Sequence, residues 1–251
     1  MDHKLEIMAL KKNFKIISFN VMDILNYIRT KGASIVWFKK MFMPVNRYIR
    51  RCNERKMNKL FTEQSEYVFS KICDSLSNEI SFWPEFGTLL GIYRDNDFIK
   101  HDCDFDFGAY VENAELIKEK RLANGFTLES EYIGIDNDEI REMTFTYNGI
   151  GIDFFYFTEM RDCMTCFVFH PYKIDLIGTN TIYKIKPFYF PYFKLEKSIF
   201  KGQTISIPVD TAKHLEYSYG PNFMIPDPNF KSIHNEYLTD FYAKKIIQNQ
   251  I

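Results

Sequence analysis

The chain has 251 residues, of which 46% are hydrophobic and 26% are charged, values that fit a folded globular protein and exclude an intrinsically disordered one. Five cysteines, an odd number spread along the chain, argue against a disulfide framework and favour a reducing, cytoplasmic compartment. The net charge of -1 at pH 7 conceals an asymmetry, because residues 1–60 contain fourteen Lys or Arg against four Asp or Glu.

Thirteen of these fourteen basic residues lie in residues 1–58, which we interpret as a helical arm preceding the main domain. Apolar residues recur loosely at helical spacing between Ile16 and Tyr48, and this pattern predicts one or two amphipathic helices interrupted near Gly32 and Pro44. A basic amphipathic arm predicts an anionic partner, such as an anionic membrane surface. The competing interpretation is that its apolar residues pack on the main domain.

The remaining sequence features bear on cellular location. No nucleic-acid partner is expected, because the basic region contains no motif that reads nucleic acid. No apolar run approaches the roughly 20 residues needed to cross a bilayer, and the N-terminus lacks the apolar core of a secretory signal. The sequence therefore predicts a cytoplasmic protein, peripheral on the inner face of the membrane if the arm binds lipid.

Residues 59–251 predict one domain of mixed helices and strands, an α/β or α+β fold. Helical periodicity is seen in residues 58–76, 88–93 and 112–122, the first of these starting near Thr62 or Ser65. Strand patterns occupy the segment EISFWPEFG and residues 103–110, 126–133, 142–148 and 149–157. The chain beyond residue 157 is expected to be rich in loops, because it contains seven prolines: Pro171, Pro187, Pro191, Pro208, Pro221, Pro226 and Pro228.

Three aspartates stand at alternate positions of the strand predicted at residues 103–110 and just before it. Side chains at alternate positions of a strand project from one face, so Asp102, Asp104 and Asp106 would form a row, with Phe105 and Phe107 anchoring the opposite face in the core. Crowded carboxylates repel each other, and a hard divalent cation relieves that repulsion. The pattern therefore favours a Mg²⁺ or Mn²⁺ site over a solvated edge strand.

A fourth carboxylate, Asp153, interrupts the apolar segment IDFFYF. A lone buried charge costs several kcal/mol unless it is paired or metal-bound, so Asp153 needs a partner. If its strand lies beside that of Asp104 and Asp106, three carboxylates converge, an arrangement that suits metal ions bridging phosphate oxygens. The alternative is a salt bridge between Asp153 and one of the many Lys or Arg residues.

Two features upstream of the aspartates could contact phosphate. Gly87 and Thr88 lie at a predicted strand-to-helix turn, where free backbone amides and the Thr88 hydroxyl suit a phosphate group. The simpler interpretation is a tight turn capped by Thr88. Arg94 follows about two helical turns later, and we predict that it pairs either with phosphate or with the acidic strand.

The stretch GTLLGIYRDNDFIKHDCDFDFGAY, with IDFFYF and the tail FPYFKLEKSIFKGQTISIPVDTAKHLEYSYGPNFMIPDP, resembles the LicD/fukutin family of the nucleotidyltransferase superfamily. The likeness spans roughly residues 80 to 230, and the fukutin branch is the nearest. It implies a nucleotidyltransferase-like mixed β-sheet flanked by helices. It also implies that Asp104, Asp106 and Asp153 are metal-binding or catalytic carboxylates, with Asp102 as a further metal ligand.

By this resemblance the protein is a phosphotransferase of cell-surface polysaccharide or glycoconjugate modification. It would move a phospho-substituted small alcohol, such as phosphocholine or ribitol phosphate, from a CDP-activated donor to a glycan hydroxyl. Gly87, Thr88 and Arg94 would bind this substrate, and Mg²⁺ or Mn²⁺ would be the cofactor. Two alternatives remain open: a nucleotidyltransferase that transfers a nucleoside monophosphate, and a catalytically inactive, membrane-associated assembly partner.

The sequence also departs from the family pattern. The Pro-Trp or Pro-Tyr that usually precedes the acids is replaced by Lys100-His101, and a frequent further acid is replaced by Cys103. Some relatives carry a zinc-binding insertion, and Cys163, Cys166 and His170 offer three of four ligands for one, although free thiols in a strand are the favoured interpretation. In the tail, His214, Tyr217 and Tyr219 are candidates for substrate contact, but packing in the fold is the favoured interpretation for each.

Overall fold

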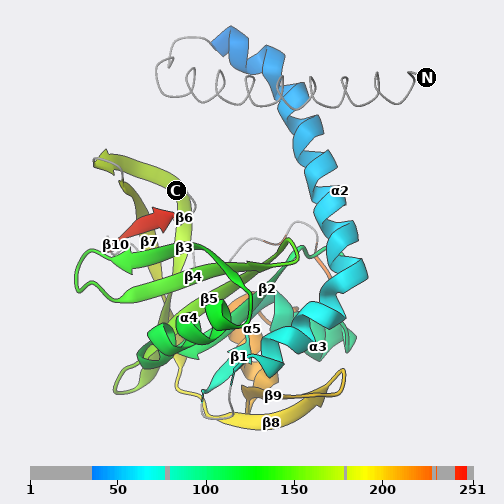
Figure 1. Ribbon diagram of the computed structural model, residues 1–251, viewed down its shortest axis with the longest axis vertical. Coiled ribbons are helices and arrows are strands. Elements are labelled where there is room, and N and C mark those ends of the chain that lie inside the picture. The colour runs from blue at the N-terminus through cyan, green and yellow to red at the C-terminus, as the bar shows by residue number, and fades with distance from the viewer. Residues whose placement is uncertain (1–35, 77–79, 178–179, 228–229, 231–240, 248–251) are drawn as a thin grey trace. The chain divides into compact units, whose positions relative to one another are not determined.

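The computed structural model describes residues 36–76, 80–177, 180–227, 230 and 241–247 (Figure 1). Clustering of backbone contacts divides the chain into two compact units, Met1–Asn53 and Glu54–Ile251. The elements, in chain order, are α2 (Val36–Asp74), β1 (Phe82–Pro84), α3 (Phe86–Asp95), β2 (Asp104–Tyr110), a 3-10 turn (Val111–Asn113), α4 (Ala114–Ala123), β3 (Thr127–Gly134), β4 (Ile140–Tyr147), β5 (Ile150–Glu159), β6 (Cys163–Ile177), β7 (Asn180–Pro191), β8 (Leu195–Phe200), β9 (Gln203–Pro208), α5 (Thr211–Tyr219) and β10 (Phe241–Ile247).

Helix α2 begins at Val36 and runs without a break to Asp74. The predicted interruption near Pro44 and the predicted helix start near Thr62 or Ser65 are therefore wrong. A proline removes one amide donor and disturbs mainly the preceding turn, and the other turns of this 39-residue helix keep their hydrogen bonds. The predicted helical pattern before residue 36 lies outside the described residues. Within the part that the structure describes, no helix is both long and apolar enough to cross a bilayer.

An eight-stranded mixed sheet forms the centre of the second unit, with the strand order β1-β2-β5-β4-β3-β10-β7-β6. Strands β2 and β5 run parallel, and the other pairings in this sheet are antiparallel. β6 also pairs with β5, so that six of the strands close into a ring. β8 and β9 form a separate two-stranded sheet. The predicted mixed α/β fold is confirmed.

One face of the sheet is covered by an aromatic core. Phe105 and Phe107 of β2 are fully buried, as their alternation with the aspartates predicted, and both pack against Phe69 of α2. Phe154 of β5 stacks on Phe107 at 5.4 Å between ring centroids. α4 contributes Ile117 to the same cluster. Since successive side chains of a strand point to opposite faces, the aspartates of β2 and β5 lie on the other face of the sheet.

Residues 163–208 form strands β6 to β9, so the predicted loop-rich portion is wrong there, whereas residues 220–227 with Pro221 and Pro226 form turns and a loop as predicted. Strands β6 and β7 pair along most of their length, and the register shifts between Phe169 and Lys173, on either side of Pro171. A proline lacks the N–H of a regular ladder and is accommodated where the pairing is irregular. Pro191 and Pro208 stand at the last positions of β7 and β9, where a missing donor is tolerated.

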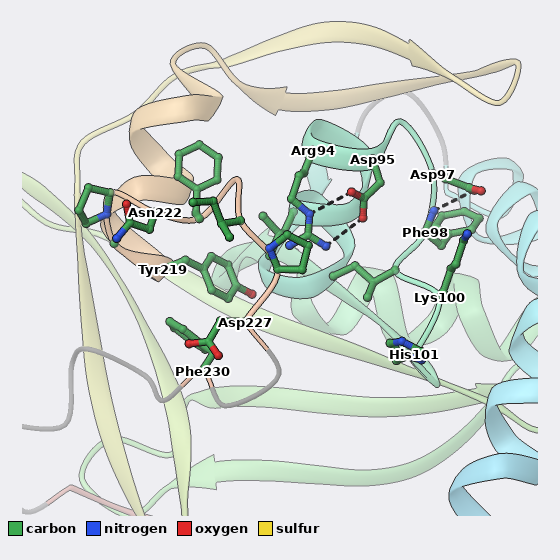
Figure 2. Close-up of a pocket in the computed structure, with 17 residues that line it drawn as sticks. Arg94, Asp95, Asp97, Phe98, Lys100, His101, Tyr219, Asn222, Asp227 and Phe230 are labelled. Atoms are coloured by element: carbon green, nitrogen blue, oxygen red, sulfur yellow. Dashed lines mark hydrogen bonds and ion pairs between the residues drawn. The ribbon is translucent and has the colours of Figure 1, made fainter.

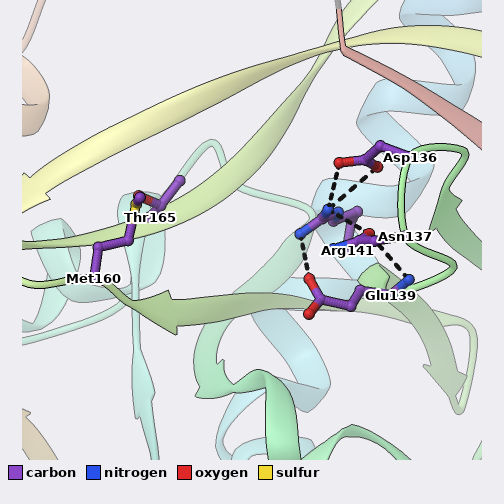
Figure 3. Close-up of polar contacts among 6 residues, drawn as sticks. All are labelled: Asp136, Asn137, Glu139, Arg141, Met160 and Thr165. Atoms are coloured by element: carbon purple, nitrogen blue, oxygen red, sulfur yellow. Dashed lines mark hydrogen bonds and ion pairs between the residues drawn. The ribbon is translucent and has the colours of Figure 1, made fainter.

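The turn between β3 and β4 is fixed by one buried guanidinium. Arg141 binds Asp136, Asn137 and Glu139 through side-chain contacts between 2.7 and 3.3 Å, as Figure 3 shows. Its guanidinium also lies 4.2 Å from the ring centre of Phe167. Figure 3 includes a second contact, in which Thr165 donates to the sulfur of Met160 at 3.2 Å. Both contacts hold the ends of strands that carry the site described below.

Candidate functional site

Two carboxylates lie opposite each other on neighbouring parallel strands. Asp106 of β2 is in register with Asp153 of β5, and Asp104 is in register with Gly151. Residues in register point to the same face of a sheet, so Asp104, Asp106 and Asp153 share the face opposite the aromatic core. The structure thus places the two aspartate-bearing strands side by side, as the sequence analysis expected.

The strand-to-helix turn at Gly87 contacts this face directly. The Gly87 amide donates to Oδ2 of Asp106 at 3.3 Å, and the Asp106 amide donates to the Thr88 hydroxyl at 2.9 Å. A Cβ atom at Gly87 would stand 3.0 Å from Oδ2 of Asp102 and 3.4 Å from Oδ2 of Asp106. Glycine therefore lets the start of α3 approach two carboxylates closely. Both the Thr88 hydroxyl and the Gly87 amide are engaged with Asp106 in this structure.

Asp102 precedes β2 instead of belonging to it, so the predicted row of three side chains on one strand is wrong. Its amide donates to the carbonyl of Ile99, and Asn58 of α2 donates to the Asp102 carbonyl at 3.2 Å, which holds residues 99–102 in a turn. The Asp102 carboxyl nevertheless lies close enough to Asp104 for the two groups to influence each other's ionisation.

The carboxyl groups of this face have raised pKa values. Burial, reinforced by the charge of Asp104, raises the pKa of Asp102 to about 7. Burial also raises the pKa of Asp153 to about 6, although a hydrogen bond from Thr144 opposes the shift. The pKa of Asp106 lies well above its ordinary value, because of burial and then the charges of Asp104, Asp153 and Asp102. Each shift means that the folded protein disfavours the ionised form.

These shifts predict that the metal-free protein loses stability as the pH rises. Asp102 and Asp153 ionise near pH 4 in the unfolded chain but near pH 7 and 6 in the folded protein. Between these values the folded state binds more protons than the unfolded state, so the free energy of unfolding falls with increasing pH. In urea titrations with EDTA, we expect a lower midpoint at pH 7.5 than at pH 5.5.

The control for this prediction is the double variant Asp102→Asn, Asp153→Asn, whose midpoint should change less over the same interval. Addition of Mn²⁺ at pH 7.5 should raise the wild-type midpoint, because a cation favours the ionised carboxylates. A wild-type midpoint that rises from pH 5.5 to 7.5 in EDTA would contradict the prediction.

A further acid, Glu142 of β4, was not identified from the sequence. Its side chain is 4% exposed, and Oε2 has no hydrogen-bond partner. Burial raises its pKa well above the ordinary value, and the charges of Asp153 and Asp106 raise it further. Glu142 lies two residues before Thr144, which is in register with Asp153. The alternation in EMTFTYN indicates a strand with Glu142 and Thr144 on one face. Only the register of β4 on β5 places that face beside Asp153 and thus brings Glu142 near the aspartates.

The donor chemistry of this face suits a hard cation, but the side chains are not gathered around one point. Asp106 binds the Gly87 amide, Asp153 binds Thr144, and Asp102 lies close to Asp104. Among the described residues, no three His, Cys, Asp or Glu side chains are grouped as ligands of a single ion. The carboxylate oxygens are of the type that Mg²⁺ and Mn²⁺ prefer, and their mutual repulsion is the property that a cation would relieve. Binding one would require rotation of these side chains.

Arg94 does not contact the acidic strand. Its guanidinium forms a two-pronged ion pair with Asp95, with Nε to Oδ1 at 3.0 Å and Nη2 to Oδ2 at 2.9 Å. The predicted salt bridge from Arg94 to the aspartates of β2 is therefore wrong, and pairing with a phosphate remains a prediction. Arg94 lines a cavity of about 1540 Å³ together with Lys100 and His101, as Figure 2 shows.

This cavity lies next to the aspartates. His101 on its wall directly precedes Asp102 in the chain, and Tyr219 at the end of α5 forms another part of the wall. The pKa of Tyr219 is raised by burial and then by the charges of Asp106, Glu85 and Asp102. The lining also includes aromatic residues, namely Phe98, Phe223 and Phe230, and three carboxylates, namely Asp95, Asp97 and Asp227. The cavity thus combines cationic, carboxylate, aromatic and hydroxyl groups (Figure 2).

The cysteine pair of β6 serves packing. Cys163 and Cys166 are three residues apart on one continuous strand, so their side chains project to opposite faces. Cys166 is fully buried in a cluster with Trp83, Phe157 and Phe190. Burial raises the pKa of the Cys166 thiol well above its ordinary value, which disfavours the thiolate that zinc requires. The side chain of His170 lies outside the described residues.

Comparison with known proteins identifies relatives of this chain. A family model described as "LicD/FKTN/FKRP, nucleotidyltransferase domain" matches residues 79–210. "Ribitol-5-phosphate transferase FKTN" from Macaca fascicularis and from Homo sapiens is 27% identical over 150 residues, and that from Mus musculus is 28% identical over the same length. Each match covers 59% of this chain and 30% of the relative, so the chain spans about a third of these longer proteins.

The family match includes the segment that builds the acidic face. Residues 79–210 contain the Gly87-Thr88 turn and all four aspartates, Asp102, Asp104, Asp106 and Asp153. They also contain strands β1 to β7, which form most of the mixed sheet, and the separate hairpin of β8 and β9. Since the model matches more than half of the chain, this protein belongs to the LicD/FKTN/FKRP family and carries its nucleotidyltransferase domain.

Proposed function

We propose that this protein is a metal-dependent phosphotransferase that moves a phospho-substituted small alcohol from a CDP-activated donor to a glycan hydroxyl, in the modification of cell-surface polysaccharides or glycoconjugates. Ribitol phosphate is the first candidate for the transferred group, because the FKTN relatives are named ribitol-5-phosphate transferases. Phosphocholine is the second, through the LicD family resemblance.

The observation that carries this proposal is the pairing of Asp106 with Asp153 against the Gly87 turn. Two carboxylates in register on parallel strands meet a helix N-terminus whose amide already binds one of them. Burial, and then neighbouring negative charge, raises the pKa values of Asp106 and Asp153, which supports a site whose carboxylates are ionised only when a cation is present. Such an arrangement suits a site in which the carboxylates bind a divalent cation and a phosphate-bearing substrate binds next to that cation.

In this proposal Asp104, Asp106 and Asp153 hold Mg²⁺ or Mn²⁺, with Asp102 as an additional ligand. A cation held there would neutralise charge at the diphosphate and on the leaving group. Asp153 either completes the metal site or accepts the proton of the acceptor hydroxyl. The amide of Gly87 and the hydroxyl of Thr88 would orient the substrate phosphate once Asp106 rotates toward the cation.

The cavity beside the acidic face is the proposed donor site. Arg94 and Lys100 offer positive charge for a diphosphate, and the rings of Phe98 and Phe223 offer apolar surface for a nucleobase. Arg94 would exchange part of its contact with Asp95 for phosphate, because that ion pair is partly exposed and its carboxylate is accessible to water. The acceptor glycan would approach from the Asp153 side.

The test is to incubate the purified chain with CDP-ribitol, CDP-choline or CDP-glycerol, a glycan acceptor and Mg²⁺ or Mn²⁺, and to measure CMP release and product mass. We expect CMP release from one donor, dependent on the cation and on the acceptor, and a product heavier by the substituted phosphate. Release of the phosphorylated alcohol, with the CMP group retained on the product, would instead support nucleotidyl transfer, which the name of the matched domain also suggests.

The same assay tests the proposal that this is an enzyme at all. A chain that binds no divalent cation in calorimetry and releases no CMP from any donor would contradict it and would support an inactive assembly partner. The proposed role of residues 1–58 at an anionic membrane is independent of the active site. It is tested by flotation of the full chain with anionic liposomes, compared with a chain that begins near Lys59.

A further inference from the structure

A second buried polar cluster lies at the start of α3, beside the backbone of Asp106, and is centred on Glu85. This side chain is completely buried. Its Oε2 accepts a hydrogen bond from the indole nitrogen of Trp83 at 2.7 Å, and its Oε1 accepts one from the amide of Phe86 at 3.3 Å. Oε1 also lies 2.7 Å from Nε2 of His214, which is 129 residues away in the chain. Three nitrogen groups therefore converge on one carboxyl group.

The hydrogen-bond geometry explains why this position suits a glutamate. The indole N–H of Trp83 and the amide N–H of Phe86 can only donate, and they approach different oxygens of Glu85. Both oxygens must therefore act as acceptors. A glutamine would point its NH₂ group at one of these two donors and leave the bond unmade. A buried donor without an acceptor is costly, so the site discriminates between two side chains of nearly equal shape.

The imidazole of His214 is held in place by two aromatic rings. It stacks on Phe190 with 4.6 Å between ring centroids and an interplanar angle of 9°. Phe193 meets it edge-on at 4.7 Å. His214 is 6% exposed, so its bond to Glu85 is shielded from water. The contact between α5 and the start of α3 thus has a fixed geometry.

The Glu85 backbone connects this cluster to the acidic face. Its amide donates to the carbonyl of Asp106 at 3.0 Å. Two residues later the amide of Gly87 donates to the Asp106 carboxylate, and the Asp106 amide donates to Thr88. Residues 85–88 therefore hold Asp106 through three hydrogen bonds. Any shift of the Glu85 side chain would move the segment that sets the position of the Asp106 carboxylate.

His214 connects the same cluster to the cavity. It belongs to α5, which ends at Tyr219 on the cavity wall, and residues 220–227 continue that wall. The bond between Glu85 and His214 is thus a direct link between the helix that leads into the cavity and the turn that holds Asp106. This link uses no residue that contacts the cavity or belongs to the proposed metal site.

We propose that Glu85 and His214 are positioning residues, which fix the Asp106 carboxylate and the Gly87 amide relative to the cavity. The part of this inference that concerns turnover rests on the proposed function, whereas the part that concerns Asp106 is tested by cation binding alone. The competing interpretation is that the pair contributes only to the stability of the fold. If the pair positions Asp106, the conservative substitution His214→Gln should restore Mn²⁺ affinity and kcat. If the pair serves stability alone, it should not.

The experiment uses three variants of the full chain, each in a Trp37→Phe background. Because the chain has two tryptophans, Trp83 is then the sole tryptophan and reports Mn²⁺ binding by quenching of its fluorescence. His214→Phe keeps an aromatic ring against Phe190 but removes the nitrogen. His214→Gln keeps a nitrogen donor near the position of Nε2, and Glu85→Gln keeps the shape but removes one acceptor. Mn²⁺ affinity, kcat, KM for the CDP donor and the thermal midpoint are measured for each.

We expect His214→Phe and Glu85→Gln to weaken Mn²⁺ binding and lower kcat by about 10- to 100-fold, the range found for groups that orient metal ligands. KM for the donor should change less than about threefold, because the cavity lining is intact. His214→Gln should restore both quantities to within about threefold of the parent, although stacking on Phe190 is lost. Far-ultraviolet circular dichroism confirms that the variants are folded.

Three outcomes would overturn the inference. Parent-like Mn²⁺ affinity and kcat in both His214→Phe and Glu85→Gln would show that the pair does not position Asp106. A parallel loss of kcat and thermal midpoint in all three variants, without rescue by glutamine, would assign the pair to stability alone. Absence of Mn²⁺ binding by the parent would overturn both this inference and the proposed metal site. If the parent binds Mn²⁺ but releases no CMP, the proposed function fails, and the affinities alone decide the positioning role.

Discussion

Replacement of Asp106 by Asn is expected to lower the rate of CMP release by roughly 1,000-fold and to raise the free energy of unfolding at pH 7.5. The rate should fall because an amide oxygen is a poor ligand for a cation whose stabilisation of the transition state is worth several kcal/mol. The stability should rise because burial, and then the charges of Asp104, Asp153 and Asp102, raise the pKa of the Asp106 carboxyl well above its ordinary value. Asn occupies the same space without a charge and can still accept from the Gly87 amide.

The matched control is Glu119→Gln, which removes one negative charge from an exposed position of α4. This variant should keep wild-type activity and stability. The two measurements are initial rates of CMP release and urea unfolding in EDTA, made on the same preparations. Unchanged turnover in Asp106→Asn would remove this residue from the mechanism. A marked loss of stability would show that the Asp106 carboxylate serves the fold.

The second large effect is expected at Gly108, where alanine should destabilise the fold by about 3 kcal/mol. A Cβ atom at this position would stand 2.4 to 2.6 Å from three atoms of the Trp83 indole. Trp83 is completely buried and is in register with Gly108 on the neighbouring strand, so it has no room to retreat. Overpacking of a buried position by one methyl group typically costs about 1 to 3 kcal/mol. The distance between the added Cβ and the Trp83 indole is shorter than side chains tolerate, so we expect a cost at the upper end of this range.

Gly151→Ala is the matched control, because it adds the same methyl group to the strand paired with β2. There the new atom would meet Cβ of Asp104 at 3.5 Å, an ordinary contact distance. Urea titrations should therefore give a clearly lower midpoint for Gly108→Ala and a nearly unchanged one for Gly151→Ala. Equal midpoints for the two variants would show that the Trp83 pocket is adaptable. Since Trp83 also binds Glu85, loss of Mn²⁺ affinity in Gly108→Ala is expected as well.

The parts of the fold that were predicted from the sequence are those governed by local periodicity. The alternation of Asp and Phe in DFDFGAY defined a strand with one aromatic face, and Phe105 and Phe107 are indeed fully buried. The segment ahead of it formed the expected short strand and helix, β1 and α3. Strands β3, β4 and β5 were also predicted within a few residues of their observed limits. Short-range patterns suffice for these elements because each buries one face along its own length.

The errors arose where long-range pairing overrides local signals. Prolines predicted loops after residue 157, yet β6 and β7 pair with each other and the register shift accommodates Pro171. Asp102 fits the alternation of β2, but the turn around Ile99, held by Asn58 of a distant helix, removes it from the strand. Local periodicity contains no information about the pairing of β6 with β7 or about the hydrogen bond from Asn58 to the turn before β2.

The site could be predicted only in part for the same reason. Asp104, Asp106 and Asp153 were identified because charges in apolar strands are conspicuous. Glu142 was missed, since its place near Asp153 depends on how β4 pairs with β5. The bond between Glu85 and His214 joins residues 129 positions apart, and nothing in either segment alone points to the other. Arg94 pairs with its sequence neighbour Asp95, which was not considered as a partner.

The most direct test of the central claim is the anomalous diffraction of manganese in crystals soaked with Mn²⁺. The account predicts an anomalous peak between Asp106 and Asp153, with at least one oxygen of each carboxylate at roughly 2.0 to 2.3 Å from the ion. It also predicts that Asp153 leaves Thr144 and that Asp106 turns from the Gly87 amide toward the ion. A crystal that shows no peak at these carboxylates, with both hydrogen bonds unchanged at saturating Mn²⁺, would contradict the account.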